Sequence, residues 1–84
     1  MIKVLYFASL RERLGQSSED LDLPEGVTHL GGLSAHLAAR GGAWEQALGG
    51  SETLMMAVNQ EAARADSQVK DGDELAFFPP VTGG

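Results

Sequence analysis

The chain is 84 residues long, with 43% hydrophobic and 21% charged residues, a composition typical of one globular domain with a single modest core. Its formal net charge of -6 argues against nucleic acid and anionic membranes as partners, because both require a basic surface, and favours docking on a basic protein. The absence of cysteine excludes disulfides, thiolate nucleophiles, persulfides and cysteine metal sites.

No stretch of the sequence has the apolar length of a membrane span. Met1 leads directly into a strand-like segment, without the layout of a signal peptide. These features predict a cytoplasmic protein.

The first predicted element is a strand over residues 2–8, which are rich in β-branched and aromatic side chains. Alternation divides its side chains between two faces, with Ile2, Val4 and Tyr6 on one and Lys3, Leu5 and Phe7 on the other. Two apolar side chains, Leu5 and Phe7, are therefore expected to point away from the core. They indicate either a partner surface or a small cluster under a loop, and the pattern leaves both open.

A short helix is predicted next, capped by Ser9 and ended by Gly15, followed by a second strand over residues 17–23. Thr28 is the predicted N-cap of a longer helix that ends near Arg40. Three leucines at helical spacing form its buried stripe: Leu30, Leu33 and Leu37.

Two pairs of residues in the longer helix bear on its stability and on metal binding. Gly31 and Gly32 weaken its first turns, and close packing on the sheet is the expected compensation. His29 and His36 lie two helical turns apart, too far along the axis to chelate one metal, so no metal site is predicted.

Further helical turns are predicted over residues 43–48, with Trp44 and Leu48 covering the edge of the core. A third strand follows over residues 53–58, and its inward residues are expected to be Leu54, Met56 and Val58. Both Met55 and Met56 are interpreted as apolar fillers.

The segment before the last strand is polar, with a short strand around residues 61–62 and Val69 as an apolar plug. Residues 71–73, Asp-Gly-Asp, predict a turn. The last strand covers residues 74–78. Its side chains are expected to alternate, with Leu75 and Phe77 toward the core and Phe78 outward beside Leu5 and Phe7.

This order of elements predicts an α+β fold of the β-grasp kind, in which a small mixed sheet wraps around one main helix. The first and last strands are expected side by side in the middle of the sheet. Residues 1–78 are then the domain, and residues 79–84 a flexible C-terminal tail.

The tail has an unusual composition. Pro79 and Pro80 remove two backbone donors and restrict φ, so the chain cannot continue the strand and should leave as an extended arm. Gly83 and Gly84 have no side chains, so the terminal carboxylate could enter a narrow channel. A frayed terminus is the alternative.

No nucleophile–base pair, phosphate-binding loop or metal triad is visible in the sequence, which favours a carrier or docking module whose chemistry lies at its end.

Three segments resemble a known family, the small subunits of molybdopterin synthase, which are ubiquitin-like sulfur carriers of molybdenum cofactor biosynthesis. The first is Met1-Ile2-Lys3-Val4-Leu5-Tyr6-Phe7-Ala8 with Arg11-Glu12, and the second is Ala57-Val58-Asn59-Gln60. The third and most specific is Asp71-Gly72-Asp73-Glu74-Leu75-Ala76-Phe77-Phe78-Pro79-Pro80-Val81-Thr82-Gly83-Gly84.

The resemblance implies a reaction sequence at Gly84. An ATP-dependent adenylyltransferase, similar to ubiquitin-activating enzymes, would adenylate the Gly84 carboxylate, and a sulfur donor would convert it to a thiocarboxylate. The thiocarboxylate would enter the active site of the large synthase subunit and give sulfur to cyclic pyranopterin monophosphate, forming the dithiolene. The chain itself would bind no cofactor, and the catalytic side chains would belong to a large subunit in a heterotetramer of two small and two large subunits.

The resemblance also implies a set of partner contacts. Phe7 and Phe78 would anchor the body, and Ala62 stands where the family tends to have a larger apolar side chain. Tail residues ahead of Gly84 would complete the contact: Pro79, Pro80, Val81, Thr82 and Gly83.

Three alternatives stay open. A thiamine-pathway sulfur carrier shares the fold and the paired glycines, but the Phe77-Phe78-Pro79-Pro80 run and the chain length argue against it. A protein modifier would form isopeptide bonds through Gly84 and shares the activation step. A plain interaction domain would have a passive tail.

Overall fold

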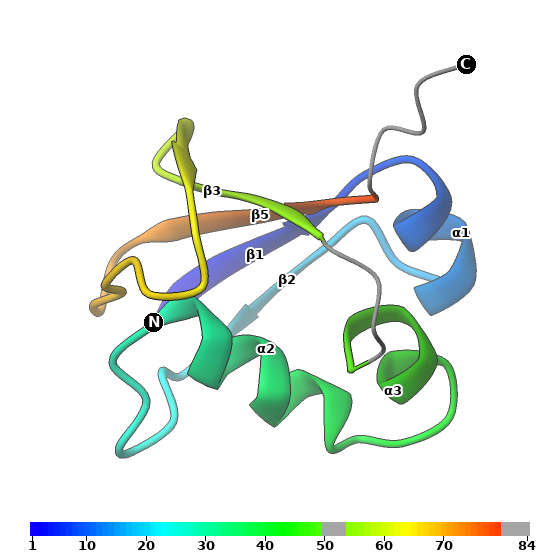
Figure 1. The fold of residues 1–84 in the computed structure, drawn as a ribbon, viewed down its shortest axis with the longest axis horizontal. Helices are drawn as coiled ribbons and strands as arrows, with labels where there is room; N and C mark the ends of the chain where they lie inside the picture. The colour runs from blue at the N-terminus through cyan, green and yellow to red at the C-terminus, as the bar shows by residue number, and fades with distance from the viewer. Residues whose placement is uncertain (50–53, 80–84) are drawn as a thin grey trace.

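The computed structural model describes residues 1–49 and 54–79. Eight elements follow one another along the chain (Figure 1): β1 (Ile2–Tyr6), α1 (Ser9–Leu14), β2 (Ser18–Leu21), α2 (Leu30–Ala38), α3 (Ala43–Leu48), β3 (Met55–Val58), β4 (Glu61–Ala63) and β5 (Glu74–Phe78). The tail that the sequence predicts lies outside the described residues, apart from Pro79.

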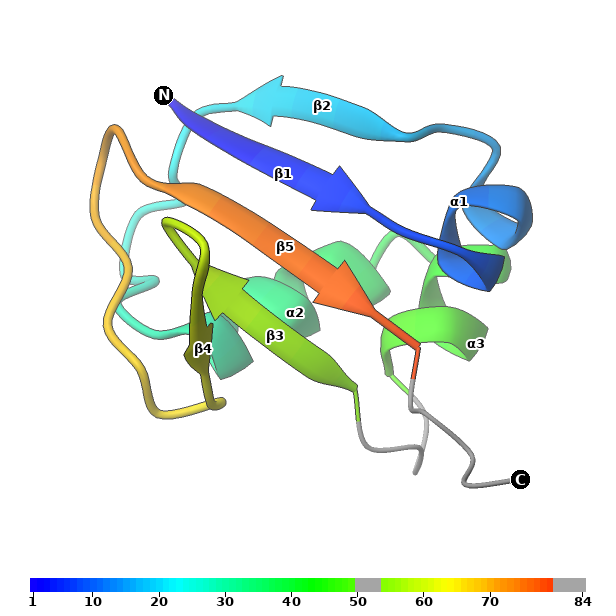
Figure 2. The same ribbon diagram turned by 90° about the horizontal axis from the view of Figure 1, so that it is seen from above.

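The strands form one mixed sheet in the order β2-β1-β5-β3-β4. Its central pair, β1 and β5, is parallel, and the other neighbours are antiparallel. Helices α2 and α3 lie on one face of the sheet, and α1 lies at the end where β1 and β5 finish (Figure 2). The predicted arrangement, a mixed sheet around one main helix with the first and last strands adjacent, is confirmed.

The core fills the space between the sheet and α2. The predicted inward residues of the central strands are buried: Ile2, Val4, Tyr6, Leu75 and Phe77. The predicted leucine stripe of α2 meets them, and Leu30, Leu33 and Leu37 are each 0% exposed. Val69 is buried as expected, while Leu54, Met56 and Val58 pack partly buried against the cluster.

Both predicted helix N-caps are wrong, whereas Gly15 ends α1 as predicted. Ser9 is the first residue of α1 rather than its cap, and the N-cap residue, Ala8, makes no side-chain hydrogen bond. The hydroxyl of Thr28 bonds His29 Nδ1 at 2.8 Å instead of a helix N–H. The first N–H groups of α2 are satisfied from a distant loop, because Leu30 N donates to Ser67 O at 3.0 Å and Gly31 N to Ala65 O at 2.8 Å.

Gly31 packs closely, but against this loop rather than against the sheet as expected. A Cβ at position 31 would lie 3.2 Å from the Ala65 carbonyl oxygen and 3.3 Å from the Ala65 Cβ. At Gly32 the nearest atom is Val27 Cγ1 at 3.6 Å. The missing side chain of Gly31 therefore lets the loop approach and cap α2.

Strand β2 is shorter than predicted because its partner is short. Leu21 pairs with Ile2, the first residue of β1, so the residues after Leu21 have no strand to pair with. Strand β3 begins at Met55, which pairs with Phe78 at the end of β5. Thr53, the predicted first residue of this strand, lies outside the described residues.

The predicted turn at residues 71–73 is confirmed, and it carries a buried carboxylate. Asp73 is 5% exposed and accepts hydrogen bonds from Lys70 N at 2.9 Å and Asn59 Nδ2 at 3.1 Å. Asn59 Oδ1 in turn accepts from Glu74 N at 3.0 Å. These bonds tie the β3–β4 turn to the start of β5 and so hold the central strand in register.

Within residues 1–49 and 54–79, no helix is long and apolar enough to cross a membrane.

Candidate functional site

The outward face of the sheet is organised in three rows that run across the strands. The register and the pleat place Asp20, Lys3 and Glu74 in a charged row at the beginning of β1 and β5. The middle row contains small and aliphatic side chains: Ser18, Leu5, Ala76, Ala57 and Ala62. The third row, at the end of β5, is apolar and consists of Phe7, Phe78 and Met55.

The two phenylalanines of the third row form a stacked pair. Their ring centroids are 4.8 Å apart with an interplanar angle of 7°, and Phe7 N donates to Phe77 O at 3.2 Å. Phe7 is 40% exposed although it is a large apolar side chain. In the part of the chain that the structure describes, these rings thus lie on an open face, which favours the partner surface over a cluster buried under a loop.

A shallow hollow of about 350 Å³ lies beside the phenylalanine pair. Alanines 57 and 76 are part of its lining, and their small side chains leave room between the larger neighbours Leu5 and Phe78. Gln60 and Glu74 are the polar residues of the lining. A hollow with apolar walls and a polar edge is suited to receive one apolar side chain of a partner.

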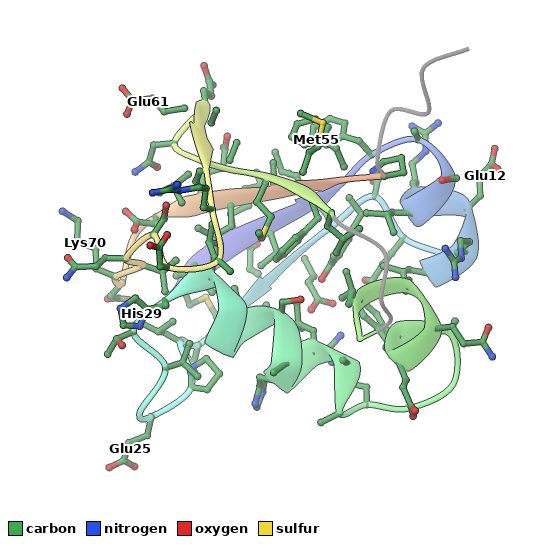
Figure 3. The ribbon with its side chains drawn as sticks, in the orientation of Figure 1. Glu12, Glu25, His29, Met55, Glu61 and Lys70 are labelled. Atoms are coloured by element: carbon green, nitrogen blue, oxygen red, sulfur yellow. The ribbon has the colours of Figure 1, made fainter. Side chains whose placement is uncertain are left out.

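Met55 extends the apolar row, a surface role that was not predicted, because Met55 was interpreted only as an apolar filler. It is 52% exposed and pairs across the sheet with Phe78. Figure 3 shows Met55 on the side of the sheet away from α2. The signal was available, because alternation that turns Met56 inward turns Met55 outward, where its flexible side chain suits an adaptable contact.

The structure brings some of the predicted contact residues together and not others. Phe7 and Phe78 adjoin each other, and half-buried Pro79 follows directly. Ala62 lies two strands away from Phe78, on the edge strand β4 opposite Ala57, and is exposed. The remaining predicted site residues lie outside the described part of the chain: Pro80, Val81, Thr82, Gly83 and Gly84.

The underside of β5 provides firm support for this row. Phe77 is 0% exposed and stacks on Tyr6 at 6.3 Å, and Tyr6 meets Trp44 edge-on at 5.4 Å. Arg40 lies 4.4 Å from the Trp44 ring centre and forms an ion pair with Glu19 at 2.8 Å. Burial of the hydroxyl, with Glu19 nearby, raises the pKa of Tyr6, so this group stays neutral in the core at physiological pH.

Among residues 1–49 and 54–79, no three His, Asp or Glu side chains lie close enough together to hold a metal ion. His29 and His36 are both exposed. The arrangement offers an apolar docking face next to the point where the chain leaves the sheet.

A family model described as the ThiS family matches residues 4–84. The chain belongs to the ThiS family. Two known proteins are similar to it over their whole length, and both are named molybdopterin synthase sulfur carrier subunit. The protein of Escherichia coli (strain K12) is 44% identical over 86 residues, and that of Haemophilus influenzae is 42% identical over 84 residues; each comparison covers 100% of both chains.

A solved structure supports the same assignment of fold. SAMP1 of Haloferax volcanii, the small archaeal modifier protein 1, superposes with a TM-score of 0.78 and 31% identity over 99% of this chain and 98% of that one. The ubiquitin-like β-grasp fold and the resemblance to molybdopterin synthase small subunits are therefore both confirmed for this ThiS-family chain.

Proposed function

We propose that the chain is the sulfur carrier subunit of molybdopterin synthase and that Gly84 is its reacting residue. The observation that carries the proposal is the full-length similarity, at 42–44% identity, to two proteins with that name. Two further observations support it. The sequence ends in Gly83-Gly84, shortly after two prolines. In the fold, a central strand ends beside an aromatic pair at the surface.

In the proposed reaction the chain supplies an acyl group and its partners supply catalysis. The Gly84 carboxylate attacks the α-phosphorus of ATP on an adenylyltransferase, which forms the acyl-adenylate and releases pyrophosphate. A sulfur donor then displaces AMP and leaves a thiocarboxylate. In the large synthase subunit this sulfur passes to cyclic pyranopterin monophosphate, and two such deliveries build the dithiolene.

The outward face accounts for docking in this proposal. Phe7, Phe78 and Met55 would contact an apolar patch of the large subunit, and the hollow beside them would accept one of its side chains. Ala62 would contribute little, because its methyl group lies at the sheet edge. The charge of -6 would speed encounter with a basic partner. The assembly would be a cytoplasmic heterotetramer of two small and two large subunits.

The deciding experiment is intact mass spectrometry of the chain purified from cells, followed by reconstitution. We expect a fraction in which one oxygen of the Gly84 carboxylate is replaced by sulfur. This fraction should form molybdopterin from cyclic pyranopterin monophosphate when the large subunit is added, and the carboxylate form should not. Equal molybdopterin formation from both forms, or no sulfur-containing form in cells that make active molybdoenzymes, would contradict the proposal.

A second candidate, protein modification through Gly84, is favoured by the likeness to SAMP1, which is named a modifier protein. The activation step is shared, so the discriminating measurement is made on target proteins. Abundant, ATP-dependent branched Gly-Gly remnants on lysines of other proteins would support conjugation. Their absence from cells in which the thiocarboxylate is abundant would leave sulfur transfer as the function.

A further inference from the structure

The amines of this chain gather at one end of the sheet. The sequence contains two lysines, Lys3 and Lys70. Lys3 lies opposite Glu74, the first residue of β5, and Lys70 lies in the loop that leads into β5. The third amine, the α-amino group of Met1, pairs with Asp71, and Gly72 N donates to Met1 O at 2.8 Å.

The reacting terminus is attached at the other end. Strand β5 advances about 13 Å from Glu74 to Phe78, at roughly 3.3 Å per residue. Pro79 follows Phe78, so the tail is attached at the end of β5, the end of the sheet at which α1 lies (Figures 1 and 2). Residues 79–84 can span at most about 20 Å. Their carboxylate reaches Lys3 or Lys70 only by doubling back along the sheet, and proline at 79 and 80 opposes that path.

The cations at the tail end are of another kind. Helix α1 begins two residues after Phe7 and carries Arg11 and Arg13, both exposed. Arg40 and Arg64 complete the cations of the sequence. A guanidinium stays protonated in proteins and has no free electron pair for attack on an acyl group, whereas a lysine amine can lose its proton and react.

We propose that this segregation protects the activated terminus from its own chain: every amine lies at the start of β5, and helix α1, at the end of the sheet where β5 finishes, carries arginine in place of lysine. The proposal rests on the proposed function, because it concerns Gly84 in an acylating form. In the side reaction that is avoided, an amine nitrogen bonds to the Gly84 carbonyl carbon, the bond to AMP or sulfur breaks, and the ammonium proton passes to water. The product is a dead internal amide.

The α-amino group fits this proposal as well. An ordinary α-amino group has a pKa of about 8, which makes it the amine most often unprotonated at neutral pH. The hydrogen bond to Asp71 raises the pKa of the Met1 amino group, so a larger fraction stays protonated and unreactive. Because a well-placed nucleophile gains a large effective concentration, the placement of the amines at the opposite end of the sheet protects in addition to protonation.

The test uses the full chain carrying a C-terminal thioester, prepared by thiol cleavage of an intein fusion. Loss of the thiol with uptake of water reports hydrolysis, and loss without water reports an internal amide, which peptide mapping then locates. The variants are Arg11→Lys and Arg13→Lys, each also combined with Lys3→Arg and Lys70→Arg. The protein concentration is kept low enough that further dilution does not change the rates of hydrolysis and amide formation. Circular dichroism checks that each variant is folded.

We expect the wild type to hydrolyse without internal amide. At least one of the two arginine-to-lysine variants should form the amide at the substituted position, at least about tenfold faster than any amide forms in the wild type. Replacing Lys3 and Lys70 should change neither result. Internal amide at Lys3, Lys70 or Met1 in the wild type, or hydrolysis alone in both lysine variants, would overturn the proposal. Because the thioester is made chemically, either outcome leaves the proposed sulfur transfer to its own test.

Discussion

Individual side chains on β5 have opposite roles although they are neighbours in sequence. Phe77 is fully buried against Tyr6, whereas Phe78 is half-buried and stacks on Phe7 at the surface. The difference follows from the pleat, which turns successive side chains to opposite faces. Stability and partner binding should therefore separate between these two positions.

Replacing Phe78 with alanine should weaken binding of the large subunit by about 2 kcal/mol, because the substitution removes half of the stacked pair. The free energy of unfolding should fall by less. The matched control is Phe77→Ala, which should lower the free energy of unfolding by about 3–5 kcal/mol because it empties a core position. Calorimetric titration and urea denaturation measure both quantities. An unchanged affinity together with an equal stability loss in the two variants would place Phe78 in the core instead.

The backbone conformation of Ala8 leads to a second prediction at the scale of single residues. As N-cap of α1 it has φ 53° and ψ -130°, and Gly42, the N-cap of α3, has almost the same conformation with φ 55° and ψ -129°. Side chains with a Cβ disfavour this region. Ala8→Gly should therefore raise the free energy of unfolding by about 1 kcal/mol, and Gly42→Ala should lower it by a similar amount. Thermal and urea unfolding measure the free energy of unfolding of both variants. Changes of the same sign in the two variants would contradict the strain argument.

At the level of elements, the helices of this protein depend on contacts from distant segments. Helix α2 has no side-chain cap and begins where the carbonyls of Ala65 and Ser67 accept its first N–H groups. Helix α3 ends at Gly49, where a Cβ would lie 3.0 Å from the Cβ of Ala38 in α2. Glycines are therefore used where the backbone of one segment approaches another closely.

Adjacent glycines in α2 allow a matched test of this dependence. Gly32→Ala should stabilise the protein by about 0.5–1 kcal/mol, because alanine favours helix and the position has room. Gly31→Ala should be less stable than Gly32→Ala by about 1 kcal/mol or more, since the new methyl group pushes against Ala65 and strains its bond to Gly31 N. Urea denaturation gives both values. Equal stabilisation by the two substitutions would show that the loop yields without cost.

For the whole molecule, the parallel pairing of β1 and β5 gives the sheet two distinct ends. The charged row of the sheet and all three amines lie where these strands begin, and the apolar row and α1 lie where they finish. The buried core of the described residues extends no further along the chain than Phe77. Under the proposed function, folding, docking and acyl chemistry would therefore be carried by different parts of one small chain.

Deletion of Gly84 should separate these parts. The melting temperature and the affinity for the large subunit should stay close to wild type, because the core and the outward aromatic face are unchanged. Sulfur transfer to cyclic pyranopterin monophosphate should be lost, because the reacting carboxyl group is displaced by one residue. Calorimetry, a binding titration and the reconstituted assay measure the three properties. A variant that still supports active molybdoenzymes would refute the role of Gly84.

Sequence reasoning predicted the fold because its signals are local. Period-two alternation assigned Tyr6 and Phe77 inward and Phe7 and Phe78 outward, and helical spacing assigned the α2 leucine stripe. The N-cap of α2 was predicted wrongly at Thr28 because the groups that satisfy α2 come from residues 65–67, which no local pattern connects to it. For α1 the prediction at Ser9 was one residue late, because the N-cap is Ala8. Met55 was not predicted to lie at the surface, because its apolar side chain was given more weight than its place in the inward–outward alternation of the strand.

The sequence by itself determined which side chains face the core and what the chain carries at its end, because these depend on residue type and spacing alone. Only the tertiary structure decided that Met55 extends the row of Phe7 and Phe78, that alanines from two strands line a hollow beside it, and that the amines lie at the opposite end. Those arrangements depend on strand register and on packing between segments far apart in the chain, and register is a property of the assembled sheet.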